Sequence, residues 1–506
     1  MSNNRLDSSK EAKLSELNQR KLKRKAELKV LTCSIEEINQ ELIQIEAEHA
    51  AIQNTRVALL ALPTEVTCLI FQFALGYHVP RHSEPFFEIT ASHVCSQWRT
   101  ISLAYPRLWR RVCYVGPKIF LRDLDRLDAY LQRSVPQGLE LWLDFRKTHI
   151  DDEEALLEKT LEHVERWKFF SVFAAEEDSL AHLLHEIEHV CAPNLEHFAF
   201  SCEVLGFPRS YDLVKNLDPT IFTNGAPKLQ SVILDCSSVA CLPSLSNITT
   251  LRLEIPHAGT VFAFPWSTFQ HILALPWLEN LSLFGHIFYS PEPSSTGQIT
   301  MTKLKHLRSE YGGMPQLLPR LRAPLLQTIT IQNHNFLDCA GASSEPYVFP
   351  SLKSVTLINI TVDTSSGEWY FAQMTESATE ILISEEASSL AIFSLLQNSE
   401  ELLKIFYWSK VKVLTCNFEI MEADDHGAFL QFAKSRCKND LVVRIFDRLD
   451  RQWRRDFSPE YDVFTEACNI EIMDVEDNPF SQLWPPGEHS FEHFHDNEDP
   501  FDIKPY

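Results

Sequence analysis

Several features are scarce in this sequence of 506 residues, and each scarcity excludes a class of protein. The twelve cysteines include no Cys-x-x-Cys pair and are too few for a disulfide scaffold. The fourteen glycines form no G-x-x-x-x-G-K-[ST] or G-x-G-x-x-G loop for phosphate binding, and no G-x-S-x-G nucleophile motif occurs. Since no run of about 18 uncharged apolar residues is found, we expect no membrane span.

Basic residues are also scarce. Lysine and arginine total 46 against 69 aspartates and glutamates, which gives a formal net charge of −23. Proteins that bind nucleic acid or anionic membranes without sequence preference need clustered positive charge, so we expect neither partner. The first ten residues, MSNNRLDSSK, are polar and resemble no secretory signal. The sequence therefore predicts a reducing compartment, with a cytoplasmic or nuclear location.

Residues 8–56 are predicted to form one long helix, because Lys, Glu, Gln, Ala and Leu dominate and the first proline is Pro63. Apolar residues recur at alternating steps of three and four, with Glu27, Glu41 and Glu48 flanking this seam. The seam residues are Leu28, Leu31, Ile35, Ile38, Leu42, Ile45 and Ile52. This pattern predicts a coiled coil and a possible homodimer through 28–52. The alternative is an amphipathic helix that lies on its own domain.

Residues 57–115 are predicted to form a small helical domain. A short helix begins near Pro63 and carries Val66, Leu69, Ile70 and Phe73 on one face. The later stretch VCSQWRTISLAYPRLW places large apolar residues at helical or near-helical spacing. So many large apolar side chains in so small a unit suggest that another molecule covers one face.

These residues carry a family resemblance. The order L-P-x-E-V from Leu62, I-F at Ile70, V-C-x-x-W-R from Val94 and P-x-L-W from Pro106 is similar to the F-box of large fungal protein families. The resemblance covers about a tenth of the chain, and a polar insertion at 76–90 matches the fungal version. It implies docking onto the small adaptor subunit of cullin–RING ubiquitin ligases. The implied adaptor-binding residues are Leu62, Pro63, Glu65, Val66, Ile70, Phe71, Val94, Trp98 and Trp109. The alternative for most of them is the core of the small helical unit.

The next region, 116–456, is predicted to alternate helices with short parallel strands. The tetrapeptide [A/F/L]-P-x-L occurs six times from APNL at 192–195 onward, and five of the six run directly into an alternating strand pattern. Aligning the L-x-x-φ-x-φ pattern, where φ is apolar, gives nine positions, which we call the anchor residues. They are Leu195, Leu229, Ile248, Leu278, Leu304, Leu326, Leu352, Ala378 and Val411.

The anchor residues lie 19 to 34 residues apart, with a mean spacing of 27. This mean falls within the range of leucine-rich repeats, which is about 20–29 residues. The region therefore resembles the irregular repeats of leucine-rich-repeat F-box proteins, although it lacks the Asn or Cys that usually follows the strand. The resemblance implies an uneven α/β solenoid in which stacked repeats share a core.

The last segment, 457–506, carries thirteen acidic residues and one basic residue, Lys504. Its charge and its WPPG sequence predict a largely disordered acidic tail.

One enzyme motif occurs, His185-Glu186-Ile187-Glu188-His189, which fits H-E-x-x-H. On a helix the two histidines could bind zinc while Glu186 activates water. However, Leu183, Leu184 and Ile187 form the apolar face of this helix, so the histidines should face solvent rather than a cleft. A zinc-dependent hydrolase is thus a remote alternative, and we expect no metal and no cofactor.

Taken together, the sequence predicts an α/β chain with a coiled-coil helix at 8–56, an F-box-like domain at 57–115, a leucine-rich-repeat-like solenoid at 116–456 and a tail at 457–506. The resemblance implies a non-enzymatic substrate-recognition subunit of a cullin–RING ligase, with an adaptor, the cullin complex and an unknown target protein as partners. The alternative is a protein-interaction scaffold without a role in ubiquitin transfer.

Overall fold

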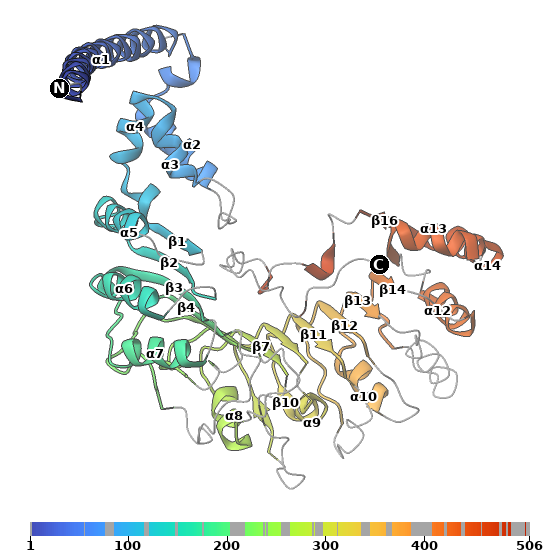
Figure 1. The fold of residues 1–506 in the computed structure, drawn as a ribbon. Helices are drawn as coiled ribbons and strands as arrows, with labels where there is room; N and C mark the ends of the chain where they lie inside the picture. Colours follow the sequence, from blue (N-terminus) through green and yellow to red (C-terminus); the bar gives the residue numbers. More distant parts are fainter. Residues whose placement is uncertain are drawn as a thin grey trace. The chain divides into compact units, whose positions relative to one another are not determined.

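The chain forms two compact units in a computed structural model (Figure 1). Unit 1 comprises Met1–Ala74 and Ile89–Leu103, and unit 2 comprises Leu75–Glu88 and Ala104–Tyr506. The structure describes residues 3–501 apart from 55, 76–85, 116–120, 147–149, 175–176, 203–217, 236–237, 239–240, 255–263, 286–287, 289–296, 311, 335–344, 361–366, 386–406, 419–422, 437–440, 457, 475–477, 482–483 and 487–500.

Unit 1 is helical. Its elements are α1 (Asn3–Asn54), the 3₁₀ helix η1 (Ala58–Ala61), α2 (Thr64–Leu75), most of α3 (Phe87–Val94) and α4 (Ser96–Leu103). The long helix predicted at 8–56 is confirmed as α1, an uninterrupted helix of 52 residues. All of its seam residues are exposed, by 51% at Leu42 to 65% at Leu28.

Unit 2 is built on a 14-stranded parallel sheet in which each strand pairs with the strands before and after it in sequence. The mixed α/β class predicted for the chain is therefore confirmed. The strands of this sheet are β1 (Arg111–Val115), β2 (Leu139–Asp144), β3 (Trp167–Ala174), β4 (His197–Cys202), β5 (Ser231–Asp235), β6 (Thr250–Glu254), β7 (Asn280–Phe284), β9 (His306–Ser309), β11 (Thr328–Gln332), β12 (Ser354–Ile358), β13 (Glu380–Glu385), β14 (Val413–Phe418), β15 (Val442–Phe446) and β16 (Asn469–Met473). A separate two-stranded sheet joins β8 (Ile299–Thr300) to β10 (Leu321–Arg322).

The connecting helices of unit 2 follow the outer side of the curved sheet, as α5, α6 and α7 show beside β1 to β4 (Figure 1). The described helices of this unit are η2 (Pro106–Trp109), α5 (Leu121–Arg133), α6 (Ile150–Leu161), η3 (Val164–Arg166), α7 (Glu177–Glu188), α8 (Trp266–Leu273), α9 (Met314–Leu317), η5 (Leu318–Arg320), α10 (Gly367–Met374), α12 (Ala423–Arg436), α13 (Asp447–Asp456), α14 (Ser458–Ala467) and η9 (Pro479–Ser481). A helix between successive strands lets neighbouring strands run parallel.

The anchor residues located nine strands of the sheet correctly. Each of the strands β4 to β7, β9 and β11 to β14 begins two residues after an anchor residue, as His197 follows Leu195 and Val413 follows Val411. Every anchor side chain is at most 4% exposed. The strand residues three positions after the anchors, such as Leu307 and Ile329, are also buried, so both sets belong to the core of unit 2.

The prediction of a disordered tail is wrong for the described part of 457–506. Residues Ser458–Ala467 form α14, and Asn469–Met473 form the last strand, β16, which pairs with β15. Tyr461 and Phe464 of α14 are fully buried. The prediction depended on the net charge of the whole segment and did not take account of this local apolar pattern. In that pattern, aromatic residues three apart share one helix face. Residues 487–500 lie outside the described part.

Two smaller findings differ from the sequence analysis. Strand β1 lies inside the stretch 57–115, so the sheet begins before residue 116. Cys468, just before β16, is disulfide-bonded, a bond that the low cysteine content did not predict.

None of the described helices is long and apolar enough to cross a membrane.

A buried charge cluster lies on the inner side of the sheet. The Glu254 carboxylate accepts hydrogen bonds from Arg252 Nε at 2.9 Å, Ser282 Oγ at 3.1 Å and Arg308 Nη2 at 3.2 Å. Arg308 Nε also donates to Ser282 Oγ at 2.7 Å. The three charged residues are only 3–6% exposed, so each depends on its partners in place of water.

We predict that Glu254→Gln destabilises unit 2 by about 3 kcal/mol, since it removes the carboxylate that two buried guanidinium groups share. Urea denaturation followed by circular dichroism measures this loss. The matched control is Glu279→Gln, which breaks the half-exposed ion pair with Lys305 at 2.5 Å. Its cost should stay below about 1 kcal/mol. Equal costs for the two variants would contradict the prediction.

Candidate functional site

The first candidate site is an exposed apolar stripe on α2. Val66 is 39% exposed, Leu69 53% and Phe73 83%. These positions are three and four residues apart, which places their side chains on one helix face. Solvent-exposed apolar side chains gathered in one stripe are typical of a surface that another protein covers.

The nine residues predicted to bind the adaptor divide into three groups. Pro63, Glu65, Val66 and Val94 are exposed, while Leu62, Ile70 and Trp98 are half-buried, and Phe71 and Trp109 are buried. The exposed and half-buried members all belong to unit 1. The structure therefore leaves seven of the nine with at least part of their side chain accessible to a partner.

Phe71 and Trp98 form the core of the small helices. The two rings meet edge to face, with their centroids 4.9 Å apart. The amide Nε2 of Gln97 donates a hydrogen bond to the Leu60 carbonyl at 2.9 Å, which ties α4 to η1. These contacts fix the backbone that presents the α2 stripe.

Trp109 lies in unit 2 and is 1% exposed. Its ring meets Tyr130 of α5 edge to face at 5.1 Å, and the Arg133 guanidinium lies 4.5 Å from its centroid. The structure thus assigns Trp109 to the packing at the start of the sheet rather than to an exposed surface.

Leu69 and Phe73 were missing from the predicted adaptor-binding set, although they are the most exposed apolar residues of α2. The helical spacing already placed both on the same face as Val66. That spacing was the signal that could have identified them, because the family motif alone names positions without regard to exposure.

The second candidate site is a pocket of about 420 Å³ on the inner side of the sheet. Its floor comes from β9 and β11 to β13, and its other wall comes from the C-terminal residues Pro479, Phe480, Trp484, Pro486 and Phe501. The floor is mainly polar. Its side chains include His306, Arg308, Gln327, Thr328, Thr330, Lys353, Ser354, Thr356 and Glu380.

Arg308 belongs to the strand floor of this pocket and contacts the C-terminal residues that form its wall. Its guanidinium lies 4.5 Å from the Trp484 ring centroid and 4.7 Å from that of Phe501. Phe501 also meets Phe284 of β7 edge to face at 5.4 Å. Cation–π contacts of this kind are stronger where water is excluded, so the C-terminal residues are well held on the sheet.

His306 is an uncharged part of the pocket floor at neutral pH. Burial, with a further contribution from Lys305, lowers the pKa of its imidazole to about 4. Its Nδ1 lies 2.9 Å from Thr328 Oγ1. Lys353 supplies positive charge at this pocket and donates to Gln327 Oε1 at 3.2 Å, while Glu380 supplies negative charge near Arg444.

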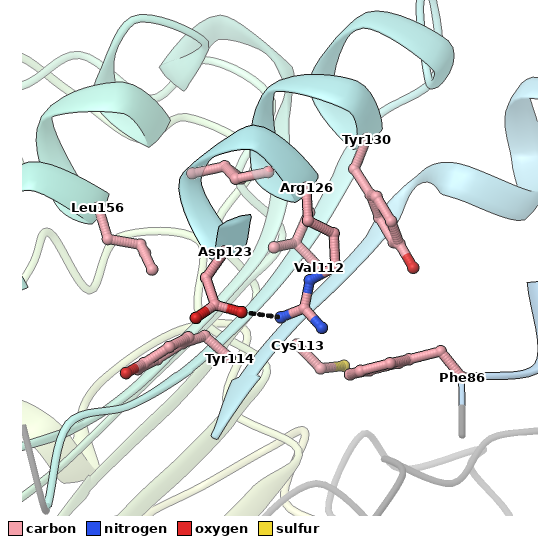
Figure 2. A pocket seen from close by; sticks show the side chains of 9 residues that line it. Phe86, Val112, Cys113, Tyr114, Asp123, Arg126, Tyr130 and Leu156 are labelled. Carbon is pink, nitrogen blue, oxygen red and sulfur yellow. Dashed lines mark ion pairs between the residues drawn. The ribbon is translucent and has the colours of Figure 1, made fainter. Parts of the chain in front are cut away.

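A third, much smaller pocket of about 10 Å³ lies where unit 2 begins (Figure 2). Asp123 and Arg126 of α5 form an ion pair of 3.9 Å beside it, and Phe86 and Cys113 close one side. Its volume suits at most one water molecule. Burial raises the pKa of the Cys113 thiol to about 12, so this pocket holds no reactive thiolate.

Next to this pocket, Tyr130 Oη donates a hydrogen bond of 2.5 Å to Glu88 Oε1. Glu88 is 5% exposed. Burial raises the pKa of its carboxyl above the usual range, although the Tyr130 hydrogen bond and the nearby Arg111 and Arg126 lower it in part. Burial likewise raises the pKa of the Tyr130 hydroxyl.

The H-E-x-x-H motif lies on an exposed surface. The side chains of His185 and His189 are 79% and 75% exposed, and both contact Glu188, at 3.8 and 3.6 Å. His189 Nδ1 also lies 2.9 Å from Thr223 Oγ1. Over the described residues, no three His, Cys, Asp or Glu side chains gather closely enough to hold a metal ion.

In comparisons with known proteins, no family model matches the chain and no curated protein matches it.

We predict that Glu88→Gln stabilises the protein at pH 7 to 8 relative to the parent chain. Glutamine still accepts the Tyr130 hydrogen bond but avoids the burial of a charge. Because the pKa of Glu88 is raised in the folded state, the native protein binds the proton more tightly than the unfolded chain does. Its contribution to stability therefore falls as pH rises from about 4.5 through the raised pKa.

Thermal melting of both proteins between pH 4 and pH 8 measures this difference. The melting temperatures should move closer together as pH falls toward 4, where Glu88 is mostly protonated in both states, and separate as pH rises. A variant that is less stable than the parent chain at pH 8 but equal to it at pH 4 would show that the charged form is the favoured one.

Proposed function

We propose that this chain is the substrate-recognition subunit of a cullin–RING ubiquitin ligase. The observation that carries the proposal is the exposed apolar stripe of α2, which overlaps the motif that resembles an F-box. In this proposal the adaptor subunit covers Val66, Ile70 and Val94, together with Leu69 and Phe73. The contact is that of an amphipathic helix whose apolar face enters a groove of its partner.

The sequential parallel sheet of unit 2 supports the second half of the proposal, a leucine-rich-repeat-like solenoid that holds a target protein. Its inner side carries the polar pocket beside Arg308, where target side chains would bind. No residue of this chain carries out the chemistry. The ligase raises the effective concentration of a target lysine near the conjugating enzyme, in the cytoplasm or nucleus.

One observation favours a second candidate, a protein-interaction scaffold without a role in ubiquitin transfer. Phe71, a predicted docking residue, is fully buried against Trp98. If the half-buried Leu62 and Ile70 also serve only the core, the small helices are a structural element and the stripe binds a different partner.

The test is a pull-down of the full chain with the purified ligase adaptor, beside the double variant Val66→Asp, Val94→Asp. Both residues are exposed, so the substitutions should leave the helices folded. Two carboxylates buried in an interface without partners should cost at least about 3 kcal/mol, which weakens binding roughly a hundredfold.

The matched control is Trp277→Asp, a 54% exposed apolar residue of unit 2 that should leave adaptor binding unchanged. Circular dichroism checks that each variant is folded. Failure of the folded parent chain to bind the adaptor would overturn the ligase role and favour the scaffold. Equal losses in the control and the double variant would mean that the stripe is not the docking surface.

A further inference from the structure

The helix α1 exposes more apolar surface than a stable isolated helix should. Twelve of its large apolar side chains are between 51% and 67% exposed. They are Leu14, Leu17, Leu22, Leu28, Val30, Leu31, Ile35, Ile38, Leu42, Ile43, Ile45 and Ile52. Helices in proteins owe most of their stability to packing of an apolar face, so this seam is suited to a partner helix.

Charge divides the same helix into two halves of opposite sign. Residues 20–29 carry six lysines and arginines and one glutamate, Glu27, which pairs with Arg24 at 2.6 Å. Residues 36–48 carry five glutamates and no basic residue. All of these charges are solvent-accessible.

This division determines which orientation a pair of identical helices can adopt. In a parallel pair, Lys21 and Arg24 occupy seam positions and would face their own copies. Glu41 at a g position of one helix would lie beside Glu46 at an e position of the other. In an antiparallel pair, the basic half of each helix lies beside the acidic half of the other. We infer that α1 binds a second copy of this chain as an antiparallel coiled coil.

The seam also fixes the register of this pair. In antiparallel coiled coils an a residue of one helix shares a layer with a d residue of the other. With Leu28 and Ile35 at a positions and Leu31 and Ile38 at d positions, a crossing near residue 33 places the basic stretch 20–29 of each helix beside the acidic stretch 36–48 of the other. Leu28 then meets Ile38 of the other copy, and Leu31 meets its Ile35.

The antiparallel arrangement separates the two copies of the α2 stripe. A rise of about 1.5 Å per residue places the two C-terminal ends of α1, at Asn54, roughly 60 Å apart. Two partners bound at these ends would therefore not compete for space along the helix pair. This inference goes beyond the proposed ligase function and does not depend on adaptor binding.

The first measurement is the mass of the full chain by light scattering, beside the variant Ile35→Asp, Leu42→Asp. We expect a dimer for the parent chain and at least a hundredfold weaker association for the variant, because both substitutions place carboxylates in the seam. A monomeric parent chain, or a variant that dimerises equally well, would overturn the inference.

The second measurement tests orientation with a charge-exchanged chain. Its basic residues Arg20, Lys21, Lys23, Arg24, Lys25 and Lys29 become glutamate, and Glu36, Glu37, Glu41, Glu46 and Glu48 become lysine. In an antiparallel dimer the exchanged chain remains complementary to itself but repels the parent chain. Co-expression with two affinity tags should therefore yield parent and exchanged homodimers and little mixed dimer. Mixed dimers as the main product would show a parallel pair and overturn the inference.

A cross-link keeps the test decisive if the exchanged chain does not fold. Leu17→Cys and His49→Cys are placed in separately tagged chains that also carry Cys33→Ser. The antiparallel register brings position 17 of one copy beside position 49 of the other, so oxidation should link the two different tags. Disulfides between identical chains alone would contradict the antiparallel register.

Discussion

The backbone hydrogen bonds between successive parallel strands are the interaction on which the rest of unit 2 depends. A single strand–helix repeat cannot satisfy the N–H and C=O groups of its own strand. The bonding extends beyond the strands themselves: Gln230 N donates to the Glu196 carbonyl, Thr249 N to the Gln230 carbonyl and Glu279 N to the Thr249 carbonyl. Each buried anchor residue directly precedes one of the residues that take part in this bonding. The anchors thereby keep each new repeat in register, whatever the length of the segment that connects it to the repeat before.

Stacking in register has a consequence for the inner side of the sheet. Side chains at equivalent strand positions form rows across it, and one row contains Arg252, Ser282 and Arg308. Two arginines on the strands that flank β7 repel each other unless an acid lies between them, and Glu254 supplies that acid. Trp484 and Phe501 then cover Arg308, which explains why aromatic residues of the C-terminal segment are buried although the segment as a whole is acidic.

Nine strands of the sheet could be located from the sequence because each of them follows a local signal, a buried anchor residue two positions before it. The tail was predicted wrongly for the opposite reason, since its burial depends on neighbouring helices. Trp453 of α13 packs against Tyr461, and Phe429 of α12 packs against Phe464. The candidate site shows the same limit. The motif identified Phe71 and Val66 equally well, but only tertiary packing distinguishes the buried Phe71 from the exposed Val66.

The two exposed apolar surfaces of unit 1 call for partners of different kinds. The seam of α1 is accompanied by positive charge in one half of the helix and negative charge in the other. A second, antiparallel copy can therefore cover the seam and neutralise both sets of charges without any other protein. The α2 stripe has no such division, because Glu65 is the only charged residue of that helix. With three exposed apolar residues, α2 buries too little to hold a copy of itself. It is better suited to insertion into a preformed groove, where the partner supplies most of the contact area.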